Sequence, residues 1–154
     1  MSDHSVAHAT FVVEHAYSAQ PAKVFAAFAS REAKANWFGE AAGPEKSDLQ
    51  LDFRVGGKET MGGGQAPGPI YKYEAIYQDI VTNRRIVYTY NMWMNDDLIS
   101  VSVATADFAA SGAGTKLTYT EQGAFLDGKD QPQFREHGTR EMLVDRLTAY
   151  IEAK

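Results

Sequence analysis

The sequence predicts an α+β domain in which a curved antiparallel sheet of seven strands wraps around one long C-terminal helix, with two short helices after the first strand. Two observations predict this class. Residues 133–154 carry an apolar stripe with helical spacing, and residues 48–125 contain strand-like runs between turn residues, without a helical period. The apolar side of a long helix must be buried, and a curved sheet offers a surface that can bury it.

The N-terminal part predicts the first strand and both short helices. Residues 8–18 alternate as a strand does. One face of this strand carries Phe11, Val13, His15 and Tyr17. Pro21 suits the first turn of a helix, and Ser30 is placed to cap a second helix over 31–37. Two glycines and a proline within 39–46 then end the helical pair.

Six further strands are predicted between turns rich in glycine, asparagine and aspartate. They comprise residues 48–55, 57–62, 69–78, 84–94, 97–109 and 114–125. Because no helical segment interrupts them, they should form one antiparallel meander. We expect the first strand of the chain to pair with the last strand, which would curve the sheet.

The last helix changes character along one face. At about 100° per residue, its second half places apolar side chains on one side. These are Leu143, Val144, Leu147, Tyr150 and Ile151. The earlier positions on that side are Glu136, Thr139 and Arg140, behind Pro132 in the first turn and Asp130 or Gln131 as cap. We therefore expect the helix to close a cup that is apolar at its C-terminal end and polar and open at its N-terminal end; alternatively, the first two turns extend into water.

Composition limits the class of protein. The 154 residues, 44% hydrophobic and 23% charged, are expected to form a single domain over 1–154. No apolar run approaches the roughly 18 residues of a membrane span, and the polar N-terminus lacks signal-peptide order, so a cytoplasmic monomer or homodimer is expected. A net charge of −5 without a basic cluster argues against nucleic acid and anionic membranes. Neutral, small or apolar partners fit better.

Metal and phosphate chemistry find little support. The chain has no cysteine, and its four histidines show no paired spacing on a helix. The glycines near 62–68 are followed neither by a lysine-serine or lysine-threonine pair nor by a helix, so a hairpin tip is the better interpretation. No nucleophile or paired-carboxylate signature can be assigned. We expect no metal and no other cofactor, and catalytic residues remain unknown.

Several short phrases occur in order along nearly the whole chain. They are ANWFG at 35–39, LDFRVGG at 51–57, GTKLT at 114–118, EHGTR at 136–140 and DRL at 145–147. This series resembles the family of proteins similar to the C-terminal domain of the activator of the ninety-kilodalton heat-shock protein ATPase (AHSA-like). The order of elements resembles the helix-grip fold of the wider START-like (SRPBCC) superfamily, which also contains polyketide cyclases and plant allergens.

The resemblance implies alternatives for function. Eukaryotic namesakes of the family stimulate a chaperone, whereas small stand-alone members are thought to bind hydrophobic or amphipathic ligands. One departure is that many relatives carry a Gly-Trp pair early in the last helix, where this sequence has residues 137–140. Because one fold hosts many functions, the function has to be inferred from the residues of the site.

Aromatic and methionine side chains are the most suggestive candidates for a ligand site. The set is Trp37, Phe38, Tyr71, Tyr73, Met92, Trp93 and Met94. Methionine adapts its shape, and tryptophan and tyrosine combine area with a donor, which suits apolar ligands. The alternative for each is core packing.

Charged side chains with inward strand parity are the second set. Glu121 is in phase with Leu117 and Tyr119. Asp107 is in phase with Ile99, Val101 and Val103, and His15 has core parity and is a candidate donor. A position at a strand end is the alternative for the two carboxylates. A buried carboxylate would need Arg140 or another donor.

Arg140 lies four residues after Glu136, its natural ion-pair partner on a helix. At the border of the apolar half, its guanidinium is expected to hold a carboxylate, phenolate or enolate head group. Trp93, Tyr73 and Met92 would receive the apolar body of that ligand.

Three functions compete at this point. The first is binding of a small hydrophobic or amphipathic ligand between sheet and helix. The second is a protein-interaction module that acts on a chaperone, and the third is a cyclase-like enzyme. A cavity of several hundred cubic ångströms would favour the first, whereas a filled core with an exposed apolar patch would favour the second.

Overall fold

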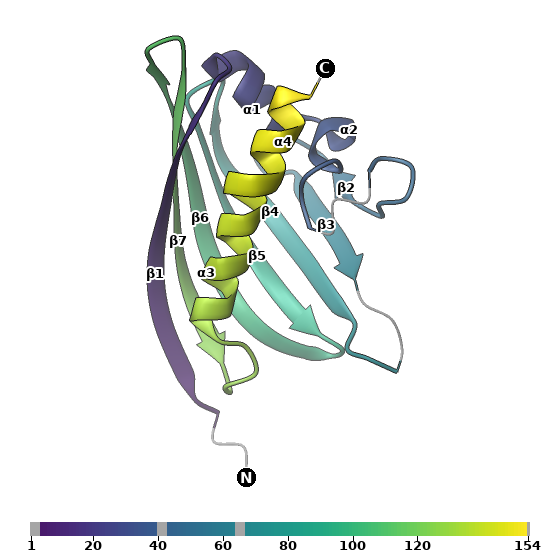
Figure 1. The fold of residues 1–154 in the computed structure, drawn as a ribbon. Helices are drawn as coiled ribbons and strands as arrows, with labels where there is room; N and C mark the ends of the chain where they lie inside the picture. The colour runs from purple at the N-terminus through teal and green to yellow at the C-terminus, as the bar shows by residue number, and fades with distance from the viewer. Residues whose placement is uncertain (1–3, 40–42, 64–66, 154) are drawn as a thin grey trace.

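The computed structural model describes residues 4–39, 43–63 and 67–153. It contains β1 (Val6–Tyr17), α1 (Pro21–Ala29), α2 (Arg31–Lys34), β2 (Gln50–Leu51), β3 (Lys58–Gly63), β4 (Tyr71–Val81), β5 (Arg85–Met94), β6 (Asp97–Ser111), β7 (Gly114–Leu126), and a C-terminal helix built from α3 (Pro132–Arg140), the π-helical segment η1 (Glu141–Arg146) and α4 (Leu147–Glu152). Figure 1 shows the sheet curving around this last helix. The predicted α+β helix-grip architecture is confirmed.

The sheet has seven strands in the order β1-β7-β6-β5-β4-β3-β2, with antiparallel neighbours. Strand β1 pairs with β7 from Val6 opposite Leu126 to Tyr17 opposite Thr115, as expected from the sequence. The short helices α1 and α2 lie beside α4 at one end of the sheet, whereas α3 lies towards the other end (Figure 1). The cup is therefore covered at the α4 end.

The apolar half of the last helix is buried as predicted. Leu143, Leu147 and Ile151 are almost fully buried, and Val144 and Tyr150 pack partly buried against the same core. Aromatic rings fill the covered end, with Phe28 in edge-to-face contact with Trp37 and Phe108. This end of the cup is a packed core.

Some element ends differ from the prediction. The second strand is only Gln50–Leu51 rather than 48–55, because the chain turns at 52–57, where a Cβ at Gly57 would collide with the Asp52 carbonyl. Strand β4 continues to Val81 through an irregularity between Tyr77 and Asp79, so the turn predicted between the strands at 69–78 and 84–94 starts later. Helix α2 ends at Lys34 instead of 37, and Ser30 caps it as expected.

The predicted cap of the last helix is only partly right. Gln131 occupies the N-cap position without a side-chain capping bond, and Asp130 accepts from the Gln131 amide instead. The turn predicted around residues 62–69 includes 64–66, and the loop predicted over 39–46 includes 40–42; both short stretches lie outside the described ranges.

The face assigned to β6 is a correction. Val101, Val103 and Asp107 point to solvent, so the expectation of an inward Asp107 is wrong. The buried positions of β6 alternate with them and are mostly small: Ser100, Ser102, Ala104, Ala106 and Phe108. Small side chains leave room for the tyrosines of β5 and β7, and β-branched valines suit an exposed strand surface. Within the described ranges, no helix combines the length and apolar character that crossing a membrane requires.

Candidate functional site

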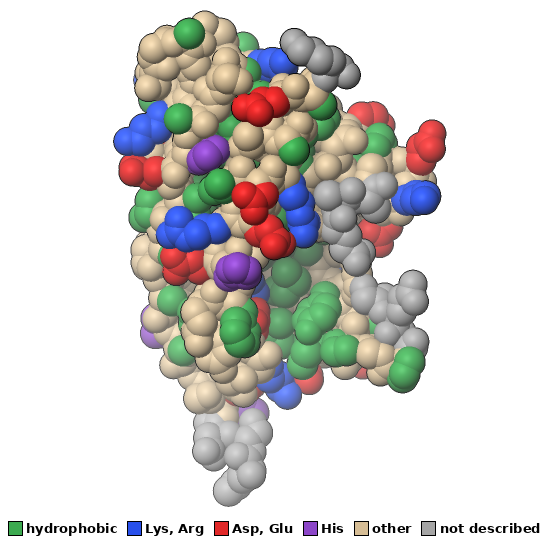
Figure 2. Space-filling model, in the orientation of Figure 1, with side chains coloured by type: hydrophobic (Ala, Val, Ile, Leu, Met, Phe, Trp, Pro, Cys, Tyr) green, Lys and Arg blue, Asp and Glu red, His purple; other side chains and the backbone are tan. Residues whose placement is uncertain are grey.

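A cavity of about 320 Å³ lies between the inner face of the sheet and the first half of the last helix. Tyrosines from three strands line it, namely Tyr73, Tyr88, Tyr90 and Tyr119. Met61, Met92 and Met142 add flexible apolar walls, and the helix contributes Arg135, Gly138 and Thr139. Figure 2 shows the corresponding hollow beside the first turns of the helix, with hydrophobic side chains gathered in it. Its volume is at the lower end of the range for small-molecule pockets.

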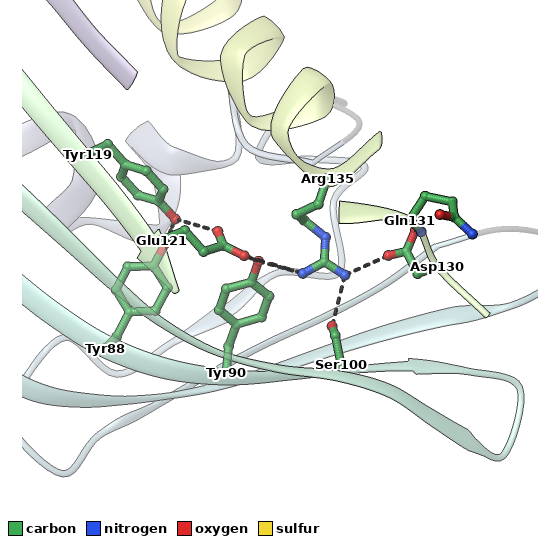
Figure 3. Close-up of polar contacts among 8 residues, drawn as sticks. All are labelled: Tyr88, Tyr90, Ser100, Tyr119, Glu121, Asp130, Gln131 and Arg135. Carbon is green, nitrogen blue, oxygen red and sulfur yellow. Dashed lines mark hydrogen bonds and ion pairs between the residues drawn. The ribbon is translucent and has the colours of Figure 1, made fainter. Parts of the chain in front are cut away.

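Glu121 forms the centre of the polar floor. Its carboxylate is 1% exposed and accepts from the Tyr90 hydroxyl at 2.6 Å. The hydroxyls of Tyr88 and Tyr119 lie 2.7 Å apart, and the Tyr119 hydroxyl lies 3.5 Å from the other carboxylate oxygen (Figure 3). A carboxylate buried among apolar rings requires such donors.

Arg135 completes this cluster from the helix. One terminal nitrogen donates to the Tyr90 hydroxyl at 2.9 Å and lies 3.4 Å from Glu121, and the other donates to Ser100 at 2.9 Å and Asp130 at 2.8 Å (Figure 3). Burial alone would lower the pKa of Arg135, but its neighbours Tyr90, Glu121 and Asp130 outweigh burial and raise it. The guanidinium therefore remains charged, held between two carboxylates.

The floor tyrosines stay protonated. Burial is the largest cause that raises the pKa of Tyr88, Tyr90 and Tyr119 above the ordinary tyrosine value, and neighbouring phenols and the charge of Glu121 add to it for Tyr90 and Tyr119. At neutral pH these hydroxyls act as neutral donors and acceptors rather than as phenolates.

A second buried polar cluster lies beside the first. The Lys34 ammonium is 2.7 Å from Glu59, and both side chains are almost completely buried. Glu59 also accepts from the hydroxyls of Tyr77 at 2.6 Å and Tyr73 at 3.3 Å. Tyr73 lies against Tyr90, with ring centroids 5.1 Å apart, so the tyrosines connect the two clusters. The ion pair joins α2 to β3 under one wall of the cavity.

Three predicted site residues lie at this cavity or under it. Tyr73 and Met92 line its wall, and Glu121 anchors the floor. Their inward positions follow from strand alternation.

Three other predicted site residues lie elsewhere. Trp37 is buried in the covered end, where its indole donates to the Ala27 carbonyl at 3.0 Å. Trp93 lies outside the cavity wall, donating to Glu74 at 2.8 Å. His15 is half-buried and makes a 3.0 Å hydrogen bond with Thr148 of α4. Trp37 is therefore a core residue, and Trp93 and His15 are engaged in contacts away from the cavity.

The placement of Arg140 and Glu136 at the cavity border is corrected. They form an ion pair of 2.8 Å on the outer side of the helix, with side chains 47% and 38% exposed. Thr139 faces the cavity, as the sequence predicts, and the charged residue beside it is Arg135 in place of Glu136. The cause is η1. A π-helical hydrogen bond spans one residue more than an α-helical one, so this segment rotates the side chains of α3 about the helix axis relative to those of α4.

Sequence reasoning missed Arg135, Lys34 and Glu59. No local pattern points to the buried ion pair, since its members are 25 residues apart on α2 and β3. The inward position of Arg135 depends on the π-helical segment, which the apolar spacing of the sequence does not reveal. The wheel of a regular helix places its neighbour Glu136 inward instead.

Comparison with known proteins supports the architecture. The sequence profile of the family described as Activator of Hsp90 ATPase homolog 1-like protein matches residues 18–152. No curated protein matches the chain.

Solved structures share the fold of this chain. A crystal structure of a Rhizobium loti protein is 41% identical, covering 96% of this chain and 99% of that one, with a TM-score of 0.88. A Rhizobium leguminosarum protein is 40% identical, covering 98% and 99%, with a TM-score of 0.90. An AHSA1-like protein from Aeromonas hydrophila shares the fold at 14% identity, covering 94% and 92%, with a TM-score of 0.65. The chain belongs to the family of Activator of Hsp90 ATPase homolog 1-like proteins.

Proposed function

We propose that this protein binds a small hydrophobic or amphipathic molecule in the cavity between the sheet and α3. Methionines and tyrosine rings would contact the apolar body, and the hydroxyls around Glu121 would face the polar group. Mostly apolar walls with a few convergent polar groups are typical of small-molecule sites.

The observation that carries the proposal is Gly138. It lies in the interior of the helix, where glycine costs roughly 0.5–1 kcal/mol relative to alanine. A Cβ built at this position meets nothing within 4 Å, so packing does not require a glycine here. Gly138 is exposed and also lines the cavity, so its missing side chain leaves the mouth of the cavity open at the expense of helix stability. A ligand that occupies this space is the simplest reason for such an arrangement.

The cavity also favours ligand binding over the alternative functions. A protein-interaction module of the chaperone-activating type would call for a filled cup and a continuous exposed apolar patch. A cyclase-like enzyme would call for a group poised to move a proton, whereas Glu121 and Arg135 are already engaged with one another and with their neighbours. Neither alternative explains the open space beside Gly138.

Fluorescence titration with N-phenyl-1-naphthylamine, a neutral dye that brightens in apolar surroundings, tests the proposal. Wild-type protein should bind the dye saturably. Gly138→Phe should fill the cavity and weaken binding at least tenfold, while unfolding in urea confirms that the variant is folded. His137→Phe adds the same ring one residue away, at an exposed position outside the cavity, and should bind as wild type does. Absence of dye binding by the wild type, or unchanged binding by folded Gly138→Phe, would contradict the proposal.

A further inference from the structure

The hydrogen-bonding capacity of the tyrosines that line the cavity is one-sided. Among the four lining tyrosines, Tyr73 donates its proton to Glu59 and Tyr90 donates its proton to Glu121. Tyr88 and Tyr119 share one hydrogen bond of 2.7 Å, which uses one of their two protons, and the Tyr119 hydroxyl lies 3.5 Å from Glu121. A hydroxyl that has donated its proton still carries acceptor lone pairs. The phenol oxygens therefore offer acceptors to a ligand and few donors.

The cations that line the cavity are already paired. Arg135 uses four hydrogen bonds on Tyr90, Glu121, Ser100 and Asp130. Arg146, which also lines the cavity, donates to the Gly39 carbonyl and pairs with Glu141 at 3.1 Å. A ligand anion would have to compete with a carboxylate that the fold already holds beside each guanidinium.

The local charge balance also disfavours an anionic ligand. The carboxylates in the cavity wall and floor are Asp130, Glu141 and Glu121, whereas the guanidiniums are Arg135 and Arg146. The wall and floor thus hold one more carboxylate than guanidinium. Bringing another anion into this partly buried space would add repulsion without freeing a donor for it.

We infer that the ligand is a neutral apolar molecule carrying a hydrogen-bond donor, such as a phenolic or alcoholic hydroxyl, and not a carboxylic acid. This inference rests on the proposed function and narrows it to one chemical class. The ligand would donate a hydrogen bond to a free lone pair of a tyrosine hydroxyl beside Glu121, and its apolar body would lie against the methionines and Gly138. It reverses the expectation from Arg140, which assigned an acidic head group to the site.

Three naphthalene probes of similar size test this inference by calorimetric titration at neutral pH. They are 2-naphthol, which is a donor, 2-methoxynaphthalene, which only accepts, and 2-naphthoate, which is an anion. Wild-type protein should bind 2-naphthol about three- to tenfold more tightly than 2-methoxynaphthalene, the range of one net hydrogen bond. It should bind 2-naphthoate at least tenfold more weakly than 2-naphthol.

A charge variant makes the test specific to the cavity. Glu141→Gln releases Arg146 from its carboxylate and should narrow the ratio between 2-naphthol and 2-naphthoate at least threefold. Glu14→Gln makes the same change in an exposed pair with Lys116, outside the cavity wall, and should leave the ratio unchanged.

Several results would overturn the inference. One is binding of 2-naphthoate as tight as that of 2-naphthol in the wild type. Equal affinities for 2-naphthol and 2-methoxynaphthalene, or an unchanged ratio in Glu141→Gln, would also contradict it. If none of the three probes binds while N-phenyl-1-naphthylamine does, only this inference fails. If that dye fails as well, the proposed function fails with it.

Discussion

Replacing Lys34 by methionine tests the buried ion pair under the cavity wall. Methionine preserves much of the apolar stem of lysine and removes only the ammonium group. Glu59 would then remain 0% exposed, with the hydroxyls of Tyr77 and Tyr73 as its remaining partners. Removing one member of a buried pair typically costs about 3–5 kcal/mol, because an uncompensated charge stays behind. That is a large share of the roughly 5–15 kcal/mol by which a domain is stable.

A double variant separates the charge from the packing. In Lys34→Met/Glu59→Gln no charge is buried at this pair, and the amide oxygen can still accept from Tyr77. We expect this protein to lose less than about 2 kcal/mol, since the remaining change is one neutral hydrogen bond and some packing. The double variant should therefore be more stable than the single variant, although it carries one more substitution.

Urea unfolding at neutral pH, followed by circular dichroism, measures these differences at constant m-value. The matched control is Lys116→Met, which breaks an exposed pair with Glu14 whose side chains are 50% and 56% exposed. Such a pair contributes about 0–1 kcal/mol. A loss below about 1 kcal/mol in Lys34→Met, or a double variant no more stable than the single one, would refute this reasoning.

Three further predictions follow from individual contacts. Gly138→Ala should raise the free energy of unfolding by about 0.5–1 kcal/mol in urea, because the new methyl group meets no neighbour; a loss would contradict this. Tyr17→Phe should lower it by about 1–3 kcal/mol, since the buried Leu143 carbonyl loses its donor; an unchanged unfolding midpoint would contradict this. Stability should fall as pH rises above about 10, because Tyr90 and Tyr119 ionise more readily in the unfolded chain. In a spectrophotometric titration their phenolate absorbance should therefore emerge only with unfolding, and reversible ionisation of the folded protein would count against it.

Most of the fold could be predicted from the sequence because its signals are local. Alternation with period two and turn residues define the strands, and one apolar stripe defines the last helix. Errors arose where backbone contacts, rather than residue types, end an element. The chain leaves β2 after Leu51 because the Arg54 amide bonds back to the Asp52 carbonyl and begins a turn. Alternation also misassigned the faces of β6, because space inside the cup required small residues there.

The cavity could be predicted only in part, for a related reason. Tyr73, Met92 and Glu121 were found because strand parity places them inward and their chemistry suits a pocket. Tyr90 and Arg135 reach Glu121 from another strand and from the helix, and no spacing in the sequence joins them to it. The pair of Lys34 and Glu59 escaped notice for the same reason, since only the folded sheet brings α2 and β3 together.

The π-helical segment decides which charges the cavity contains. In a regular helix aligned on Leu147, the wheel places Glu136 and Arg140 on the inner side at about 100° per residue. The additional residue in the π-helical turn shifts this phase by one position, so Arg135 and Thr139 lie inward. Tyr17 supports the segment by donating to the Leu143 carbonyl at 2.5 Å. Arg135 is thereby brought to the carboxylates of Glu121 and Asp130, while the pair of Glu136 and Arg140 stays in solvent. One irregular turn thus keeps the helix packed at one end and brings an arginine between two carboxylates at the other, which supports the inference that the ligand is neutral rather than acidic.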